Sequence, residues 1–416
     1  MKLNPLSFVK PLSLALTLAT TGLSSQAVYA STITIDPADK NQSVAFGADI
    51  KLTLKGVDDG NTSAVMDRFV EMGMDLVRVP IYTTRDISDP FYERVYRVSD
   101  IAEDKGLKIF ASVANGDGDQ NNNLHHADKF ASSFFCNCSY NLYNLNLTKY
   151  AAYLDDYLDN MQINDATVDI LGPYNEDDAD DSDYNKIWNQ MVRNDFQRIG
   201  VETYALQAGI NKVADVEDRL DIIGAHFYDD ANFSYAQKDS KWNELVTATN
   251  HPTWFTESTR YALGSTDLES ARLGLEHFIP AIRGGAERVI IYQTANRLVW
   301  YNGGTRAYRF STAKHFMTNA DGQVAGSTSD DTDLTTVSFV NNGVLSVNIT
   351  NKNSTDKTVT IQLQNGYKAS GTVTRTIWTA TDEGTANTYH LGNNASWNVT
   401  VPAGSYVHLD VPLNQL

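Results

Sequence analysis

Short apolar runs alternate with longer amphipathic segments between residues 44 and 293. This alternation is typical of a repeated strand and helix, because strands of a parallel sheet are buried on both faces and their crossover helices on one. Eight strand-like runs are present: Val44–Asp49, Leu76–Pro80, Lys108–Val113, Val168–Pro173, Glu202–Gln207, Asp221–Phe227, Thr253–Thr256 and Arg288–Gln293. Eight such units within about 250 residues match one closed (β/α)8 barrel in size. The pattern therefore predicts a TIM barrel of the α/β class.

The segments between these runs carry helix-end signals. Thr62–Gly73, Tyr92–Gly106 and Tyr184–Gly200 have helical spacing of apolar residues, and each closes on a glycine suited to a left-handed cap. An open doubly wound sheet is the structural alternative, but it would need a glycine-rich phosphate loop after its first strand. The stretch Phe46–Lys51 reads Phe-Gly-Ala-Asp-Ile-Lys and is not such a loop. The closed barrel is therefore favoured.

After about residue 320 the pattern changes to strand-like alternation without a helix signal. The runs are separated by Asn, Gly, Asp and Ser, and they are Leu334–Val340, Val344–Thr350, Thr358–Leu363, Thr372–Thr379, Ala395–Val401 and Tyr406–Val411. They predict an antiparallel β-sandwich over residues 321–416, with residues 31–40 as a candidate extra strand and the barrel over residues 31–320. Trp378 and Trp397 fit a carbohydrate-binding surface or, as is commoner for tryptophan, the core.

Residues 1–30 have the features of a signal peptide. Lys2 and Lys10 precede and flank an apolar run, and small residues lead up to Ala30. We expect cleavage after Ala30 and a secreted or periplasmic protein. A membrane anchor is the alternative, but the apolar run is too short to span a bilayer and is interrupted by Ser13 and Thr17.

Composition restricts the partners of the chain. The net charge is −18, and loss of the two leader lysines takes it to −20. Because such a surface repels polyanions, nucleic acid and anionic membranes are not expected partners. The two cysteines, Cys136 and Cys138, are too few for a zinc site, and we expect either a local disulfide or free thiols. We expect a monomer without a cofactor.

One acidic loop is a candidate calcium site. Asp117, Asp119 and Asn121 place oxygen ligands at alternate positions, and Asp128 is the twelfth residue of the loop. The sixth position is Asn122 instead of the glycine of helix–loop–helix sites, and the last ligand is Asp instead of Glu. A solvated or sugar-binding loop is therefore the favoured interpretation, and no other metal site is expected.

Two glutamates carry most of the chemical information. Glu176 closes the run that begins at Val168, and Glu257 closes the run that begins at Pro252. By the strand count these acids follow strands four and seven, at the barrel end where active sites lie. An acid at the end of a buried strand is costly unless it does chemistry, and glycoside hydrolysis requires two carboxyl groups. The pair therefore predicts a polysaccharide hydrolase.

With these positions the chain resembles the clan of retaining β-glycosidases on (β/α)8 barrels. The resemblance rests on Asn175–Glu176 and Thr256–Glu257, and it implies that Glu176 is the acid/base and Glu257 the nucleophile. Arg78 matches the clan's strand-two arginine, which keeps the nucleophile ionised. His226 and Tyr228 match a His-x-Tyr pattern in the cleft, and the resemblance places Asn175 on the sugar 2-hydroxyl. A carboxyl separation of roughly 5 Å would permit a covalent glycosyl-enzyme and retention of configuration.

Several aromatic residues near the predicted strand ends are candidates for stacking on sugar rings: Tyr82, Trp254, Tyr292, Trp300 and Tyr301. Trp254 is the most suited to the core, because it lies within the predicted seventh strand. Four arginines, Arg85, Arg260, Arg297 and Arg306, are candidates for a basic patch that a sulfated chain would need, although the charge of −20 favours a neutral polymer.

The barrel followed by a sandwich resembles glycoside hydrolase family 30, but the Trp- and Pro-rich end of that family's third strand is missing from Ala111–Asp119. The stretch Leu171–Asp178 is closer to the agarases and porphyranases of family 86. This resemblance implies an endo-acting enzyme on a red-algal galactan of the agar or porphyran type. Two alternatives stay open. One is a xylanase or glucanase of the family 30 type, and the other is a carbohydrate-binding protein whose glutamates are idle.

Overall fold

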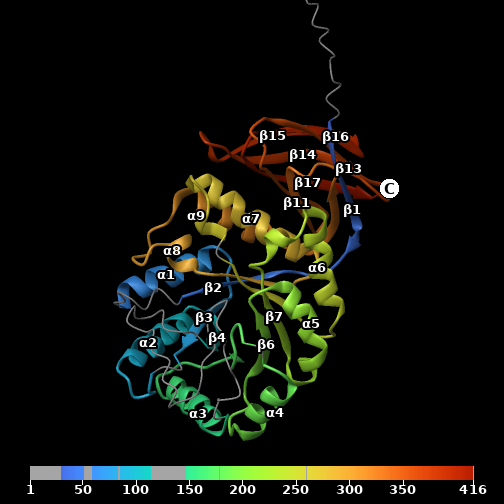
Figure 1. The fold of residues 1–416 in the computed structure, drawn as a ribbon. Coiled ribbons are helices and arrows are strands. Elements are labelled where there is room, and N and C mark those ends of the chain that lie inside the picture. The colour runs from blue at the N-terminus through green and yellow to red at the C-terminus, as the bar shows by residue number, and fades with distance from the viewer. Residues whose placement is uncertain are drawn as a thin grey trace, which may run out of the picture.

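The computed structural model of the chain describes residues 30–50, 59–82, 85–113, 147–177, 179–258 and 260–415. These residues form a closed barrel of eight parallel strands and a nine-stranded sheet (Figure 1). The predicted fold class, a TIM barrel followed by a C-terminal antiparallel β-domain, is confirmed, and the strands predicted as a β-sandwich are joined in one hydrogen-bonded sheet. The candidate signal peptide up to residue 29, the candidate calcium loop and both cysteines lie outside the described residues.

The barrel strands are β2 (Ala45–Asp49), β3 (Leu76–Ile81), β4 (Lys108–Val113), β5 (Ile170–Gly172), β6 (Gln197–Thr203), β7 (Ile222–His226), β8 (Thr253–Glu257) and β9 (Arg288–Ile291). Each pairs in parallel with the next, and β9 closes the barrel on β2. One layer of the interior consists of inward-facing apolar side chains: Leu76, Phe110, Ile170, Ile199, Ile222, Trp254 and Ile290. Trp254 is therefore a core residue, and the barrel below the strand ends is filled.

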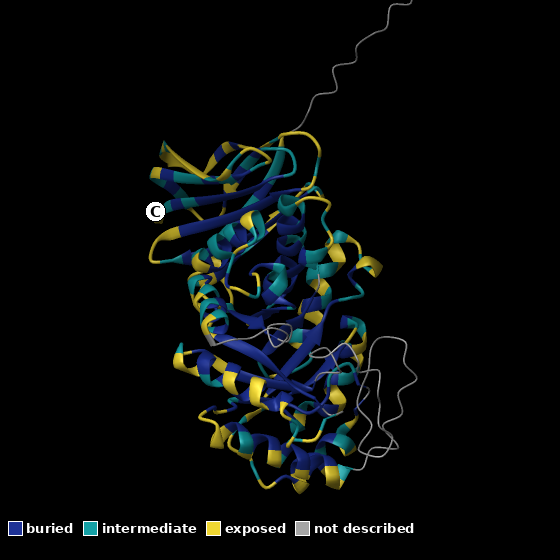
Figure 2. Ribbon diagram, turned by 90° about the vertical axis from the view of Figure 1, so that its left-hand side faces the viewer, coloured by how far each residue is buried: buried dark blue, intermediate teal, exposed yellow. Residues whose placement is uncertain are grey.

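Helices surround the barrel on its outside (Figure 1). They are α1 (Asp59–Glu71), α2 (Phe91–Asp104), α3 (Leu147–Ile163), α4 (Asp181–Gln190), α5 (Leu206–Val216), α6 (Tyr235–Thr247), α7 (Asp267–Arg283), the short α8 (Thr294–Arg297) and α9 (Ala307–Asn319), with 3-10 turns at Glu217–Arg219, Asp230–Asn232 and Arg260–Ala262. Their inner faces are buried and their outer faces exposed (Figure 2). This amphipathic arrangement explains the helical periodicity of the sequence.

The fifth barrel strand differs from its prediction. The sequence pattern places a helix over Tyr184–Gly200 and a strand over Glu202–Gln207, but α4 ends at Gln190 and β6 begins at Gln197. Gly200 is not a helix cap. It lies inside β6, where a β-carbon would come within 2.5 Å of the Tyr184 hydroxyl. The prediction was wrong because the glycine serves close packing of α4 on β6, and Glu202 consequently lies at the carboxyl end of the strand.

The second body is a sheet in the order β15-β14-β17-β12-β11-β10-β1-β13-β16. Its strands are β1 (Ser31–Lys40), β10 (Gln323–Ser329), β11 (Leu334–Asn341), β12 (Val344–Asn351), β13 (Lys357–Leu363), β14 (Tyr367–Trp378), β15 (Glu383–Asn394), β16 (Ser396–Val401) and β17 (Tyr406–Gln415). All pairs are antiparallel except β1 with β13. The sequence did not predict β10 and β15, and the side chains of β15 are mostly exposed and polar. Trp378 and Trp397 are both buried and belong to the core.

The two bodies share a core. The hydrophobic cluster of the barrel continues through α7 and α9 to Val324, Phe339, Trp378 and Tyr406 of the sheet, and Figure 1 shows both helices between barrel and sheet. Trp378 donates a hydrogen bond to the Ser311 hydroxyl of α9 at 3.2 Å. Packing of this kind holds the sheet against the side of the barrel. Within the described residues, none of the helices combines the length and the apolar character that crossing a bilayer requires.

Candidate active site

The carboxyl ends of the barrel strands bring polar side chains from distant parts of the chain together. Six of these residues are ionisable: Asp49 of β2, Arg78 of β3, Glu176 after β5, Glu202 of β6, His226 of β7 and Glu257 of β8. All except Glu176 are less than a tenth exposed as whole residues, and the Glu176 side chain is 7% exposed. In a TIM barrel this end carries the active site, so the cluster is the candidate catalytic centre.

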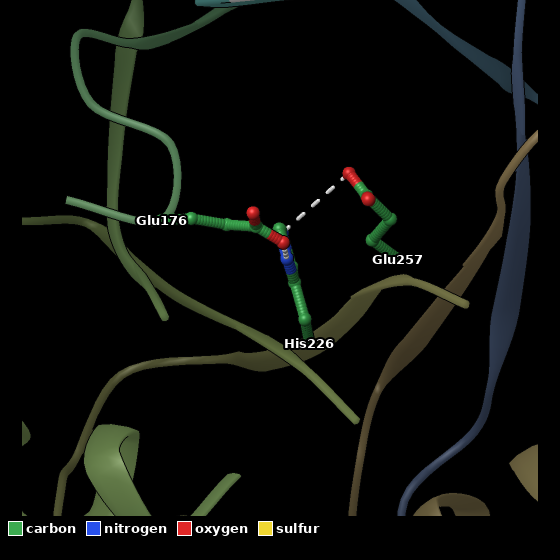
Figure 3. A group of neighbouring side chains, drawn as sticks. All are labelled: Glu176, His226 and Glu257. Atoms are coloured by element: carbon green, nitrogen blue, oxygen red, sulfur yellow. Dashed lines mark hydrogen bonds and ion pairs between the residues drawn. The ribbon is translucent and has the colours of Figure 1, made fainter. Parts of the chain in front are cut away.

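Glu176 and Glu257 form a carboxylate pair. One oxygen of each, together with a ring nitrogen of His226, lie within 4.8 Å of one another (Figure 3). Glu257 is the last residue of β8, whereas Glu176 lies in the turn after β5 with a left-handed backbone, φ +61°. The backbone N–H of Glu176 donates to the carbonyl of Glu202 at 2.8 Å. This bond holds the unusual backbone conformation that directs Glu176 toward Glu257.

Arg78 and Tyr228 hold the Glu257 carboxylate. Arg78 Nη1 donates to Oε2 at 2.5 Å, and the Tyr228 hydroxyl donates to Oε1 at 2.7 Å. Arg78 Nη2 donates to Asn175 Oδ1 at 2.6 Å and to the Ser112 hydroxyl at 3.1 Å. One guanidinium therefore links Glu257 to the residue that precedes Glu176. Such charge-assisted bonds favour the ionised carboxylate.

Glu257 shifts the pKa of both Arg78 and Tyr228. Burial alone would lower the pKa of Arg78, but the carboxylates of Glu257, Glu202 and Asp49 raise it above its usual value. Burial, followed by the charge of Glu257, raises the pKa of Tyr228 well above that of free tyrosine. At neutral pH, Arg78 is therefore a cation and Tyr228 a neutral hydrogen-bond donor.

His226 is a second buried cation. Its Nδ1 lies 2.9 Å from Glu176 Oε1, and its Nε2 lies 3.8 Å from Glu257 Oε2 and 3.9 Å from Glu202 Oε2. Burial alone would lower the pKa of His226, but Glu257, Glu176 and Glu202 together raise it to about 10. The spacing of Glu176, His226 and Glu257 suits a divalent metal, but a protonated imidazole has no lone pair to offer one. Without a metal, His226 therefore pairs with these carboxylates as a cation.

Glu202 is a site residue that the sequence did not predict. Its side chain is fully buried, and Thr256 Oγ1 donates to its Oε1 at 2.5 Å. Because the fifth strand was predicted to begin at Glu202, this residue was expected at the barrel end opposite Glu176 and Glu257. The signal that could have found it is the one that marks Glu176 and Glu257, an acid that closes the apolar run Ile199–Val201.

Three aromatic candidates, Tyr292, Trp300 and Tyr82, differ in how far they are buried. Tyr292 is half-buried just beyond β9, and its peptide bond to Gln293 is cis. Trp300 is 42% exposed, and the Arg306 guanidinium stacks on its ring. Tyr82 is fully buried, with its ring edge-to-face against Phe91. Tyr82 therefore packs in the core and offers no exposed ring, contrary to the prediction that it stacks on sugar.

Comparisons with known proteins place this fold. No family model and no curated protein matches the chain. A GH30 endoxylanase from Clostridium papyrosolvens C71 superposes with a TM-score of 0.66 at 16% identity, over 92% of this chain and 100% of that one. The fold is that of the family 30 glycoside hydrolases.

Two further structures agree with this assignment of the fold. A family 30 subfamily 8 xylanase from Clostridium acetobutylicum has a TM-score of 0.67 at 16% identity, over 92% of this chain and 99% of that one. CelM2, a bifunctional glucanase-xylanase from a metagenome library, has a TM-score of 0.56 at 13% identity, over 92% and 99%. The predicted likeness to family 30 is confirmed for barrel and sheet together. The likeness to family 86 stays a prediction.

Proposed function

We propose that this protein is a retaining glycosidase that hydrolyses a β-linked polysaccharide by double displacement. The observation that carries the proposal is the carboxylate pair, whose nearest oxygens are within 4.8 Å. Retaining enzymes separate their carboxyl groups by roughly 5 to 5.5 Å, whereas inverting enzymes leave roughly 6.5 to 9.5 Å for a water molecule. The short separation is below the range of inverting enzymes and supports a covalent intermediate on one of the two carboxyl groups.

In the first step, the ionised Glu257 attacks the anomeric carbon while Glu176 donates its proton to the leaving glycosidic oxygen. The carbon–oxygen bond breaks, and a glycosyl ester forms on Glu257. In the second step, Glu176 takes a proton from water, the water oxygen attacks the same carbon, and Glu257 leaves as a carboxylate. The two donors on Glu257, from Arg78 and Tyr228, support its role as nucleophile and as leaving group.

Asn175 supports the same assignment. Its Oδ1 accepts from Arg78 at 2.6 Å, which fixes the amide directly beside Glu176. A neighbouring amide can hydrogen-bond the sugar 2-hydroxyl, a contact that strengthens in the transition state. We propose this role for Asn175, and stacking on sugar rings for Tyr292 and Trp300, whose rings lie on loops after β9.

Two substrate classes remain. A xylan or a glucan is supported by the solved structures of similar fold, which include endoxylanases and a glucanase-xylanase. A red-algal galactan is supported by the stretch Leu171–Asp178. Of the four arginines considered for a sulfated chain, Arg85 is paired with Asp89 and Arg260 with Asp230. These two arginines are thereby less suited to a basic patch, which favours a neutral polymer.

The test is the release of reducing sugar from agarose, porphyran, carrageenan, xylan and β-glucans by the wild type, Glu176→Gln and Glu257→Gln. We expect one polymer to be cleaved into oligosaccharides and both variants to be inactive. Product anomers followed by NMR should first appear with the β configuration of the substrate. Activity that survives either substitution, or products that first appear inverted, would overturn the mechanism. Tight binding of a polymer without cleavage by the wild type would instead favour the carbohydrate-binding alternative.

We also propose export of the chain, with cleavage after Ala30, and action as a monomer. The features that support export are the basic start and the apolar run before Ala30. N-terminal sequencing of protein recovered from the culture medium or periplasm should begin at Ser31. Sedimentation of the purified protein should give the mass of one chain.

A further inference from the structure

Glu202 is a third glutamate at the catalytic end of the barrel, and the proposed mechanism gives it no chemical step. Its carboxylate is fully buried, with Oε2 at 3.9 Å from Arg78 Nη2 and 3.9 Å from His226 Nε2. These separations are beyond hydrogen-bond reach, but charges at this distance interact strongly in a buried site. Glu202 therefore acts on the two cations by its charge. Burial of a carboxylate costs stability that two ion pairs at 3.9 Å offset only in part, which makes a purely structural role unfavourable.

The backbone around Glu202 has an unusual conformation that turns its side chain toward the site. Val201 and Glu202 both have left-handed backbones, φ +74° and +41°, and the register between β6 and β7 shifts at this point. A β-branched residue rarely adopts such a conformation. A bulge of this kind re-aims a side chain, and here the carbonyl of Glu202 also accepts the N–H of Glu176 at 2.8 Å. The bulge therefore connects the backbone of Glu202 with that of Glu176, the proposed acid/base.

The neighbouring strand makes room for this carboxylate. A β-carbon at Gly224 of β7 would lie 2.0 Å from Glu202 Oε1. No side chain at position 224 is therefore compatible with the observed place of Glu202. On the other side, Thr256 of β8 donates its hydroxyl to the same oxygen. The position of the carboxylate is fixed by β7 and β8 together.

We propose that Glu202 is a positioning residue whose charge keeps His226 a cation through both steps and whose carbonyl fixes Glu176. This inference rests on the proposed function. Glu257 loses its negative charge when it becomes a glycosyl ester, whereas Glu202 forms no bond in either step. His226 faces Glu176, Glu257, Glu202 and Tyr228, and Glu202 itself faces Arg78, Thr256 and Tyr184. Of the carboxylates around His226, only Glu202 takes no part in proton transfer or bond formation.

The direct test is the titration of the His226 ring by NMR in protein labelled at histidine, with His226→Gln used to assign the signal. In Glu202→Gln we expect the pKa of His226 to fall by one unit or more, because one of the carboxylates that raise it is removed. Glu202→Asp keeps the charge and should recover much of the shift. The kcat of Glu202→Gln should fall by about 10-fold to 100-fold at neutral pH, with KM nearly unchanged, because the binding contacts and the backbone bond to Glu176 are intact but His226 loses one of the carboxylates that keep it charged.

Two further variants separate charge from packing. Thr256→Val removes the hydrogen bond to Glu202 but keeps the charge, so the titration of His226 should stay close to that of the wild type. Gly224→Ala displaces the carboxylate and should lower the pKa of His226 as Glu202→Gln does. An unchanged His226 titration in Glu202→Gln would overturn the inference, even if activity fell. Because this readout needs no substrate, it remains decisive if the wild type cleaves no polymer and the proposed function itself fails.

Discussion

Arg78→Lys tests whether the several N–H donors of the planar guanidinium are needed to hold the residues of the site in place, or whether a positive charge is sufficient. The guanidinium donates to Glu257 at 2.5 Å, Asn175 at 2.6 Å and Ser112 at 3.1 Å. These partners come from β8, from the turn after β5 and from β4. A lysine ammonium keeps the positive charge, but it is a point donor on a flexible stem and cannot span all three partners.

The expected loss follows from the number of bonds. If lysine keeps the bond to Glu257, the bonds to Asn175 and Ser112 are lost. Hydrogen bonds to charged groups contribute about 1.5–3 kcal/mol each, and the bond from Arg78 to Asn175 is the shorter of the two. A loss of about 3–4 kcal/mol of transition-state stabilisation corresponds to a decrease of roughly 10²-fold to 10³-fold in kcat/KM. Most of the decrease should be in kcat, because the 2-hydroxyl contact of Asn175 strengthens in the transition state.

The assay is kcat and KM on the polymer that the substrate screen identifies, with thermal unfolding of each variant beside it. Arg97→Lys is the matched control, because Arg97 pairs with Asp100 on the outer surface of α2 and its side chain is 50% exposed. The control should behave as the wild type. If Arg78→Lys retained wild-type kcat/KM while it remained folded, the link from Glu257 through Arg78 to Asn175 would have no part in catalysis, and the reasoning above would be refuted.

Three further predictions follow from the packing and the charges. The pKa of His226 is about 10 in the folded protein, above the usual histidine value of 6.5, because Glu257, Glu176 and Glu202 surround the ring. The stabilisation that the charged ring gives is therefore complete below pH 6.5 and is lost as the pH rises toward 10. Urea unfolding across this range should show a decline in stability that His226→Gln reduces. Gly200→Ala should lower the free energy of unfolding by about 1–3 kcal/mol, because its β-carbon would overlap the Tyr184 hydroxyl, whereas Gly392→Ala, whose nearest contact is at 4.0 Å, should have a small effect in the same assay. Trp300→Ala should raise KM for the polymer about tenfold with little change in kcat, as expected for a lost stacking contact; an unchanged KM would remove Trp300 from the binding surface.

Local sequence patterns were sufficient to predict most strands of the barrel. The run Thr253–Thr256 predicts β8 because aromatic and β-branched residues follow directly after a proline. They were insufficient for β6, since Ile199–Val201 is short and polar residues flank it on both sides. The deciding interaction is tertiary. The Tyr184 hydroxyl accepts the N–H of Val201 at 2.9 Å and occupies the space that Gly200 leaves.

The same limit applies to the site. Glu176 and Glu257 could be placed because each closes an apolar run, and their proximity followed from the closure of a barrel. The bond from Arg78 to Asn175 joins residues 97 positions apart, and no local pattern encodes it. The edge strand β15 was missed for another reason, because its exposed, polar side chains give no apolar alternation. Its backbone pairing with β14 defines it instead.

The charges of the cluster bear on the choice between a catalyst and a binding protein. In double displacement the carboxylate pair carries one negative charge throughout, which moves from Glu257 to Glu176 when the glycosyl ester forms. A cation that stabilises both states must reach both ends of the pair. Arg78 contacts Glu257 and the residue before Glu176, and His226 lies between the two glutamates. Buried ionised groups cost stability. A surface that only binds neutral sugar gains nothing from two cations held in this way. The arrangement therefore favours an active hydrolase.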